Sequence, residues 1–218
     1  MPPPASRPPL TRERILEAAV AISDAEGIAA LSMRRLAREV GVEAMSLYHH
    51  FANKEALLDG LVDAVAGEIA LPDAALEWKE SMRTRAGSIR HVLLRHPWVA
   101  PLFLSRVNVG PNMLRLVDAT IGSLRAAGFS LAAADHAWNA IDAYTFGFTI
   151  QEQSFPFEPS EYAAAAEAFL PRIPAETYPH LHAMSRAIID GEHDGRHDFA
   201  RGLEWLLDGL EREWGGGR

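Results

Sequence analysis

Apolar residues recur along most of the chain at intervals of three and four positions, which is the period of a helix with one buried face. No sustained alternation of apolar and polar residues, the pattern of a half-buried strand, rises above noise. We therefore expect an all-α protein of about nine or ten helices. The expected segments beyond residue 75 are about 76–95, 112–127, 130–153, 160–170, 176–190 and 199–214, with a short one at about 99–105.

Residues 32–54 predict two short helices joined by a turn. Ser32 is a suitable cap for the first helix, whose apolar stripe ends at Val40, and Gly41 is placed to end it in a left-handed conformation. Leu47 continues the apolar set, so the second helix can lock against the first and still enter a major groove. The side chains of the second helix that this leaves largely outside the core are Ala44, Met45, Ser46, Tyr48, His49 and His50.

Two further helices complete the expected N-terminal unit. One is capped by Thr11, is closed by Gly27 and supports the helix-turn-helix motif from behind. The other follows Asn53 and runs to about residue 70, before the sequence Leu-Pro-Asp at 71–73 ends the unit.

The formal net charge of −8 does not exclude a nucleic-acid partner, because the charge is unevenly distributed. Residues 1–58 hold seven Lys or Arg and seven Asp or Glu, whereas residues 59–218 hold 14 and 22 and account for the whole excess. A neutral segment can still present a locally basic face, which here would be formed by Arg34, Arg35, Arg38 and Lys54. We expect contacts with DNA phosphates, so that the affinity for DNA falls steeply as the salt concentration rises.

The composition and the absence of certain motifs argue against several other classes of protein. The chain has 218 residues, 48% of them hydrophobic, and no cysteine, so a sizeable core is expected without disulfides or thiolate ligands. It shows neither a signal-peptide core nor the roughly 18 to 20 uninterrupted apolar residues of a membrane span, so we expect a cytoplasmic protein. No HExxH, GxSxG or GxGxxG motif and no phosphate-binding loop occurs, and we expect no catalytic residues, metal or cofactor.

Residues 10–58, LTRERILEAAVAISDAEGIAALSMRRLAREVGVEAMSLYHHFANKEALL, resemble the DNA-binding domain of the TetR/AcrR family of bacterial transcriptional regulators. Later segments are similar, in the same order, to the ligand-binding domain of the tetracycline-repressor branch: RHPWVAPL (95–102), VGPNMLRL (109–116), YTFGFTIQEQ (144–153) and FARGLEWLLDGLE (199–211). This resemblance implies a homodimer that binds double-stranded operator DNA through two heads and a small-molecule effector through a pocket in each C-terminal domain.

The resemblance also assigns roles to side chains of the motif. Arg34 matches a base-contacting arginine, and Tyr48 and Lys54 match phosphate-contacting positions. Their chemistry suits these roles independently, because arginine binds both acceptors of a guanine edge, and serine or histidine can bond to bases or phosphates. The alternative is that Tyr48 and His50 only pad the motif and that Arg34 is a solvated surface charge. The recognition-helix positions themselves are Ala44, Met45, Ser46, His49 and His50.

Tetracycline repressors, by the same resemblance, hold a magnesium chelate with a histidine and a glutamate. Here Gln151 occupies the expected glutamate position, Glu152 points about 100 degrees away on the helix, and no histidine clearly matches. We therefore expect a ligand other than magnesium-tetracycline. The pocket candidates form an apolar and aromatic set, of which each residue taken singly is more often core than ligand contact. They are Trp98, Leu102, Phe103, Met113, Leu116, Trp138, Ile141, Tyr144, Phe148 and Gln151.

The helix at about 131–153 and the final helix carry apolar residues on more than one face, which a monomer would not bury completely. We therefore expect these helices to form the homodimer interface. The alternative is that they cover only their own domain. The expected interface residues are Gly147, Leu203, Leu206, Leu207 and Leu210.

Four histidines between residues 180 and 197 suggest a metal site, because two imidazoles four residues apart on a helix can share an ion. Gly191 and Gly195 argue against a helix over the later pair, and aspartates alternate with these histidines. A solvated acidic loop is the preferred interpretation.

Together these patterns predict a ligand-responsive transcriptional regulator, most simply a repressor that is released from a palindromic operator by a small, largely apolar or aromatic molecule. A rival of another class is an all-α ligand carrier or enzyme that uses the C-terminal pocket, and an activator or nucleoid-associated role also stays open. The expected domains are a flexible proline-rich arm at 1–9, a DNA-binding domain at 10–58, a ligand-binding and dimerisation domain at 59–214, and a tail at 215–218.

Overall fold

The structure is a computed structural model that describes residues 9–73, 75–195 and 197–214. These residues form eleven α-helices, short 3₁₀ turns and no strand, so the all-α prediction is confirmed. The count slightly exceeds the expected nine or ten, and the short helix expected at about 99–105 is present at Ala100–Ser105. No helix in this part of the chain is long and apolar enough to cross a membrane. The predicted tail, and the predicted arm except for residue 9, lie outside the described residues.

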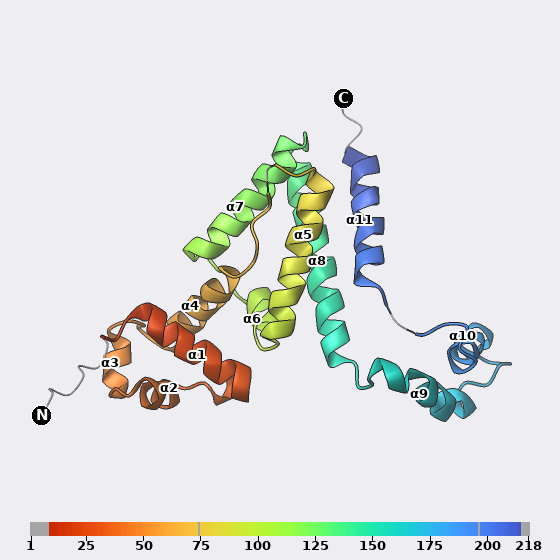
Figure 1. The fold of residues 1–218 in the computed structure, drawn as a ribbon, viewed down its shortest axis with the longest axis horizontal. Coiled ribbons are helices and arrows are strands. Elements are labelled where there is room, and N and C mark those ends of the chain that lie inside the picture. The colour runs from red at the N-terminus through yellow and green to blue at the C-terminus, as the bar shows by residue number, and fades with distance from the viewer. Residues whose placement is uncertain (1–8, 74, 196, 215–218) are drawn as a thin grey trace, which may run out of the picture.

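Three helices form a compact head, and a fourth leads from it into the rest of the molecule (Figure 1). The predicted caps form, since the side chains of Thr11, Ser32 and Asn53 each accept a backbone N–H from the first turn of the following helix. Gly41 ends the second helix at φ +72°, a left-handed conformation that glycine adopts without steric cost. The four helices are α1 (Arg12–Glu26), α2 (Met33–Val40), α3 (Ala44–Tyr48) and α4 (Lys54–Ala66).

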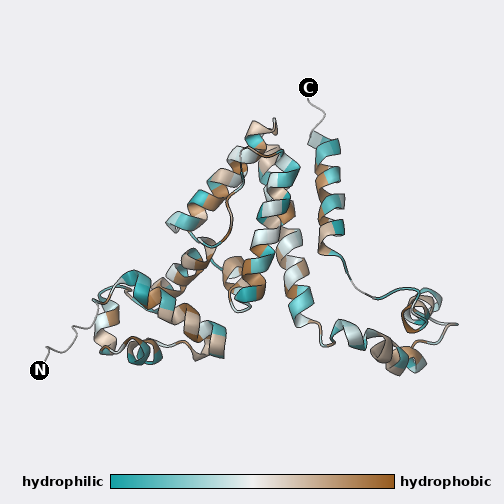
Figure 2. Ribbon diagram, in the orientation of Figure 1, coloured by the Kyte–Doolittle hydropathy of each residue, from teal (hydrophilic) through white to brown (hydrophobic). Residues whose placement is uncertain are grey.

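The body is built around two long helices that run side by side, α5 and α8, with α7 on one side and α11 on the other (Figure 1). Hydrophilic and hydrophobic residues are interleaved along these helices, as expected for helices that each bury one face (Figure 2). The body helices are α5 (Trp78–Arg95), α6 (Ala100–Ser105), α7 (Pro111–Ala126), α8 (Leu131–Ser154) and α11 (Phe199–Trp214).

Between α8 and α11 the chain forms an arm that extends away from the body (Figure 1). The arm contains α9 (Tyr162–Phe169) and α10 (Pro179–Ile189), which pack mainly on each other. Large apolar side chains on its surface include Phe169, Leu181 and Met184. The arm therefore adds little to the core of its own protomer.

Several helices are shorter than predicted. The helix expected to reach residue 70 ends at Ala66, and a turn follows in which Glu68 bonds back to Val65. The helix expected from residue 176 begins at Pro179, because proline suits a first helical turn but lacks the N–H that an interior position needs. The ends of a helix are less well defined by the sequence pattern than its middle, because the last turn of a helix frays and can be extended or shortened by one or two residues.

Two hydrophobic clusters make up the core. The first is continuous from the head into the body, because it contains Ile15 and Leu47 of the head together with Leu93 and Leu116 of the body. The second joins α5, α8 and α11 around Phe129. Head and body thus share packed side chains as well as α4. A division after residue 58 would fall inside α4 and stays a prediction.

Candidate nucleic-acid interface and ligand cavity

The recognition segment is displayed on the surface of the head. Leu47 is fully buried, whereas Met45 and Tyr48 are 71% and 44% exposed. Ser46 and Ala44 are half-buried. The segment therefore rests on the head through Leu47 and presents its other side chains outward, as a groove-reading helix must.

The recognition helix is shorter than the sequence predicts. It ends at Tyr48, and His49 and His50 follow it in a turn. The chain turns there because Phe51 inserts into the core at 1% exposure. His49 is exposed and His50 is half-buried, so both remain at the edge of the surface that the helix presents.

Two arginines of α1 hold the motif in place. Arg14 donates to the carbonyl of Val40 at 3.2 Å, and Arg12 donates to the carbonyl of His50 at 3.0 Å. The Arg12 guanidinium also lies 4.1 Å from the ring centroid of Phe51. These contacts attach the end of α2 and the turn that follows α3 to α1.

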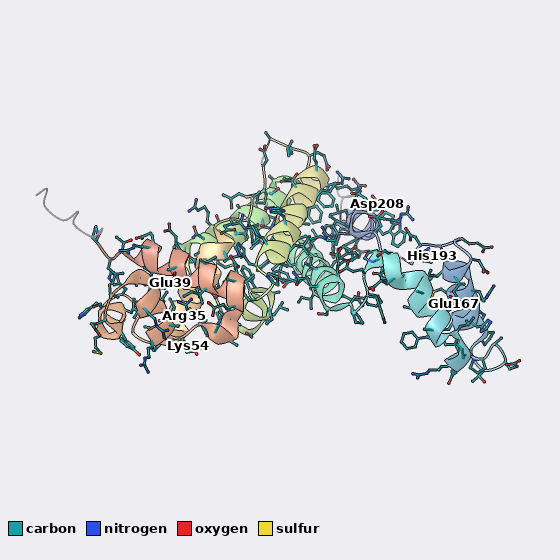
Figure 3. The ribbon with its side chains drawn as sticks, turned by 60° about the horizontal axis from the view of Figure 1, so that its bottom comes forward. Arg35, Glu39, Lys54, Glu167, His193 and Asp208 are labelled. Carbon is teal, nitrogen blue, oxygen red and sulfur yellow. The ribbon has the colours of Figure 1, made fainter. Side chains whose placement is uncertain are left out.

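The expected basic face of the head needs one correction. Arg34, Arg38 and Lys54 are exposed, and none has an ion-pair partner among the described residues. Arg35 instead pairs with Glu39 at 2.5 Å and with Glu26 at 2.9 Å, and these hydrogen bonds raise its pKa. Its charge is therefore compensated within the head, where Figure 3 labels Arg35, Glu39 and Lys54.

The body contains a cavity of about 290 Å³ between α5, α6, α7 and α8. Its wall is mostly apolar and aromatic, with a few polar groups, which is the usual character of a small-molecule site. Four of the ten predicted pocket residues lie in this wall: Phe103, Met113, Leu116 and Trp138. The other residues of the wall are Ile69, Arg85, Ile89, Leu104, Val117, Asn139, Asp142, Ala143 and Phe146.

The other six predicted pocket residues lie elsewhere in the protomer. On α8 the direction of each side chain around the helix axis decides which residues reach the cavity. Asp142 lies in the wall, and Tyr144, two residues later, points about 200 degrees away from it. Tyr144 and Phe148 pack on Phe199 instead. The remaining four are Ile141, which is buried in the second cluster; Gln151, which is exposed; and Trp98 and Leu102, which pack at the first cluster.

Sequence reasoning missed the polar centre of the cavity, an ion pair between Arg85 and Asp142. Two terminal nitrogens of Arg85 lie 2.5 and 3.1 Å from the two carboxylate oxygens of Asp142, and the indole N–H of Trp138 donates to the same carboxylate at 2.6 Å. Both residues left a signal in the sequence. Arg85 lies on the apolar stripe of α5 beside Met82 and Ile89, and Asp142 is the single charged residue between positions 136 and 151.

The helices that form the cavity also hold α4. Arg106, just after α6, pairs with Asp59 at 2.8 Å and with Glu55. Asp63 accepts the backbone N–H groups of Asn112 and Met113, at the beginning of α7, each at 3.0 Å. A change in the cavity that moves α6 or α7 therefore acts directly on the helix that carries the head.

A larger hollow of about 900 Å³ lies between the head and the body. Some of its polar groups are engaged with one another: the His96 ring nitrogens lie 2.7 Å from Asp24 and 3.1 Å from Glu68, and Trp98 donates to Asp24 at 2.6 Å. Because these bonds join α1 to the body, the hollow is better described as a joint than as a ligand site.

The residues predicted for the dimer interface differ in their burial within the protomer. Leu203, Leu207 and Leu210 are at most 6% exposed and pack inside their own protomer, because this stripe of α11 faces α8. Leu206 is half-buried and Gly147 is exposed. Trp205, which the sequence analysis did not select, is 70% exposed on the outer face of α11.

Two of the four histidines at 180–197 have neighbours other than a second histidine. Nδ1 of His182 lies 2.7 Å from the carbonyl of Ile173, and His193 lies near Asp194. Figure 3 labels His193 near α9, on the side of the molecule away from the head. Within the described ranges, no group of three or more His, Asp or Glu side chains is placed to hold a metal ion.

An exposed helix-turn-helix head, joined by α4 to a helical body that contains a cavity, defines the class of helix-turn-helix transcriptional regulators. Residues 15–61 match the family model described as bacterial regulatory proteins, tetR family, and residues 71–214 match that of the tetracyclin repressor-like C-terminal domain. The chain belongs to the TetR family, as its motifs predict.

Individual relatives are similar to this chain over nearly its whole length. An HTH-type transcriptional regulator from Saccharopolyspora erythraea is 34% identical over 206 residues, covering 94% of this chain and 86% of the relative. Among solved structures, Streptomyces coelicolor ActR in complex with actinorhodin has a TM-score of 0.80 and 31% identity, covering 97% of this chain and 100% of ActR. BioQ with its double-stranded DNA operator has a TM-score of 0.64 and 30% identity, covering 94% of this chain and 99% of BioQ. The family and these relatives are transcriptional regulators, not enzymes.

Proposed function

We propose that this protein is a repressor that binds a palindromic operator as a homodimer and leaves it when a small, largely apolar or aromatic effector occupies the cavity between α5, α6, α7 and α8. The observation that carries the proposal is the double attachment of α4, which bears the head and is held by Arg106 and by the beginning of α7. Two similar proteins support it, since BioQ was solved with its operator and ActR with actinorhodin. Acting on DNA, the protein would work in the cytoplasm.

On the DNA side, Arg34 would contact a base, and Tyr48 and Lys54 would contact phosphates. All three side chains are exposed on the head. The other groove-facing positions would be Ala44, Met45, Ser46, His49 and His50. Two heads of a dimer would read successive major grooves about 34 to 36 Å apart, which is one turn of DNA.

On the ligand side, an effector would displace α6 and α7, and the ion pairs and hydrogen bonds of α4 would pass the displacement to the head. Couplings of this kind are typically about 1 to 3 kcal/mol, which corresponds to about 5- to 150-fold in DNA affinity. Ligand affinity must change by the same factor when operator is bound. Magnesium-tetracycline is not the proposed effector, because Gln151 is exposed and away from the cavity.

The test of the DNA part uses an operator selected from a random duplex library with the full-length protein. Fluorescence anisotropy then compares wild-type protein with Arg34→Ala. Loss of a base contact should weaken operator binding by about 1 to 3 kcal/mol, or about 5- to 150-fold, and relax the sequence preference.

Arg172→Ala is the matched control, because Arg172 is an exposed arginine on the arm, far from the head. It should leave operator affinity unchanged, and both variants should remain dimers in sedimentation. Wild-type affinity in Arg34→Ala, or loss of the dimer, would assign Arg34 to the surface or to structure instead.

A further inference from the structure

Arg12 of α1 makes two contacts at the end of the recognition segment (residues 44–50). Its Nη1 donates to the carbonyl of His50 at 3.0 Å, and the centre of its guanidinium lies 4.1 Å from the ring centroid of Phe51. Phe51 is 1% exposed, so this ring is anchored in the core of the head. A guanidinium can stack on a ring and donate within its own plane at the same time, which an ammonium group cannot do. Arg12 therefore links the end of the recognition segment to α1.

Gly60 brings α4 against the same contact. A Cβ at Gly60 would lie 2.9 Å from a ring carbon of Phe51 and 3.3 Å from Nη2 of Arg12, both closer than ordinary van der Waals contact. The backbone of α4 thus lies directly against both side chains. Glycine weakens the interior of a helix, and here the close approach is the physical reason for its presence.

The contact lies at the part of α4 that the body holds. Asp59, next to Gly60, pairs with Arg106 at 2.8 Å, and Asp63 accepts two backbone N–H groups at the beginning of α7 at 3.0 Å. Asp59 and Asp63 are about one helical turn apart. The residues of α4 that the body holds and the residue against which Arg12 lies are therefore immediate neighbours.

We propose that Arg12 is a positioning residue for DNA recognition, which holds the end of the recognition segment against α4 at Gly60 and does not itself bind DNA. The discrimination between operator and other DNA depends on this contact. The proposal rests on the DNA binding proposed above and adds the residue that ties the recognition segment to α4. Without the contact, the segment has to be brought into its DNA-reading position during binding, and the affinity for the operator falls by the cost of doing so.

The test has to separate positioning from direct contact, because Arg12 is exposed and an exposed arginine can also bind a phosphate. A phosphate contact contributes equally to operator and scrambled DNA, and its loss reduces the slope of log affinity against log salt by about one unit. Loss of a positioning contact lowers the affinity for the operator alone. Fluorescence anisotropy with the full-length protein therefore measures both duplexes over a series of salt concentrations.

Arg12→Lys keeps the charge and removes the stacked planar group, so operator affinity should fall about three- to tenfold. Arg12→Ala should lower it about five- to fiftyfold, the range expected for one hydrogen bond and one cation–π contact. Affinity for scrambled DNA and the salt slope should match those of the wild type for Arg12→Lys, and those of the charge-matched control Arg172→Ala for Arg12→Ala.

Gly60→Ala disturbs the same contact from the side of α4. The added methyl group displaces the Phe51 ring and the Arg12 guanidinium, so operator affinity should fall about three- to tenfold with no change for scrambled DNA. Gly87→Ala on α5 is the control, since a Cβ there meets no atom within 4 Å. It should leave both affinities unchanged, and thermal unfolding of every variant checks that binding is measured on folded protein.

Two further measurements test the link itself. Because Arg12 and Gly60 act on one contact, the double variant Arg12→Ala with Gly60→Ala should bind the operator no more weakly than Arg12→Ala alone. Hydrogen–deuterium exchange without DNA should be faster over residues 46–51 in Arg12→Lys than in the wild type, because the segment opens more easily.

The inference is overturned if both Arg12 variants bind the operator as the wild type does. It is also overturned if Arg12→Ala weakens operator and scrambled binding by the same factor with a smaller salt slope, which would make Arg12 a phosphate contact. Multiplied effects in the double variant would overturn the link to α4. A wild-type protein that selects no operator would instead remove the proposed function, and hydrogen exchange over residues 46–51 would still decide whether Arg12 positions the segment.

Discussion

Asp63 and Gly110 form a contact at the junction of α4 and α7 in which a single methyl group matters. Asp63 accepts the backbone N–H groups of Asn112 and Met113, and its charge lies at the positive end of α7. A Cβ at Gly110 would approach the Asp63 carboxyl carbon and oxygen to 2.2 Å. Glycine is therefore required at this position by close approach rather than by its backbone angles.

We expect Gly110→Ala to lower the free energy of unfolding by about 1 to 3 kcal/mol, because the added methyl displaces the carboxylate and leaves the α7 amides without their acceptor. Urea denaturation measures the change. Gly122→Ala is the control on the same helix, since a Cβ there meets no atom within 4 Å. It should be neutral or stabilise the protein by up to about 1 kcal/mol, and equal effects of the two substitutions would contradict the argument.

At the scale of elements, α11 is attached to α5 by charges as well as by its leucines. Arg83 of α5 bonds to Glu204 at 2.9 Å, and Lys79 bonds to Asp208 at 2.9 Å and to Glu211. These hydrogen bonds lower the pKa of Glu204 below its ordinary 4.5 and that of Asp208 below its ordinary 3.8. The charged form of both carboxylates is thus favoured by Arg83 and Lys79 of α5.

We expect the docking of α11 to weaken in acid. A carboxylate whose pKa is lowered by folding stabilises the folded state fully above its ordinary pKa, and this contribution is lost as the pH falls through the lowered value. For Glu204 the loss begins below about pH 4.5 and stays within the roughly 0 to 1 kcal/mol typical of exposed pairs. Urea unfolding at a series of pH values should give a shallower acid slope for Glu204→Gln than for the wild type.

Glu213→Gln provides the comparison for this pH experiment, because Glu213 is exposed on the same helix and has no ion pair among the described residues. Its acid slope should match that of the wild type. Identical slopes for Glu204→Gln and the wild type would mean that the Arg83 contact does not contribute.

At the scale of the whole molecule, one protomer leaves apolar surface on the outer side of α8 and α11. Trp205 is 70% exposed on α11, and Gly147 on α8 is also exposed. An exposed tryptophan on a helix beside small residues is typical of a surface that a second copy covers. The proposed dimer would therefore use this outer face, with Trp205 in place of the inward leucines.

We expect Trp205→Glu to shift the protein from dimer to monomer at micromolar concentration, because a charge would be buried at the centre of the interface. Sedimentation equilibrium measures the shift. Val107→Glu is the control, since Val107 is 92% exposed near the joint and away from α11. A dimer that survives Trp205→Glu unchanged would place the interface elsewhere.

The substitution Leu207→Ala distinguishes a residue of the protomer core from a residue of the dimer interface. Leu207 is fully buried against its own α8. Its truncation should lower the stability of the protomer by about 2 to 5 kcal/mol, which differential scanning calorimetry measures, without changing the surface that a partner meets.

The sequence predicted the features that depend on neighbours along the chain. Thr11, Ser32 and Asn53 cap their helices, and Gly41 turns the chain between α2 and α3, because capping and left-handed turns involve residues within a few positions of one another. The spacing of apolar residues likewise predicted that Leu47 is buried, as it is in the structure. The head and its exposed recognition segment were therefore predictable.

Only the tertiary structure decided which face of each body helix meets which neighbour. Arg85 and Asp142 lie 57 positions apart and pair because α5 and α8 pack in one particular rotation, which also turns Tyr144 and Phe148 away from the cavity. The same packing directs Leu203 and Leu207 inward and leaves Trp205 outside. A helical period shows that a helix has a buried face, but what that face meets depends on contacts between distant segments, and these form only when the chain has folded.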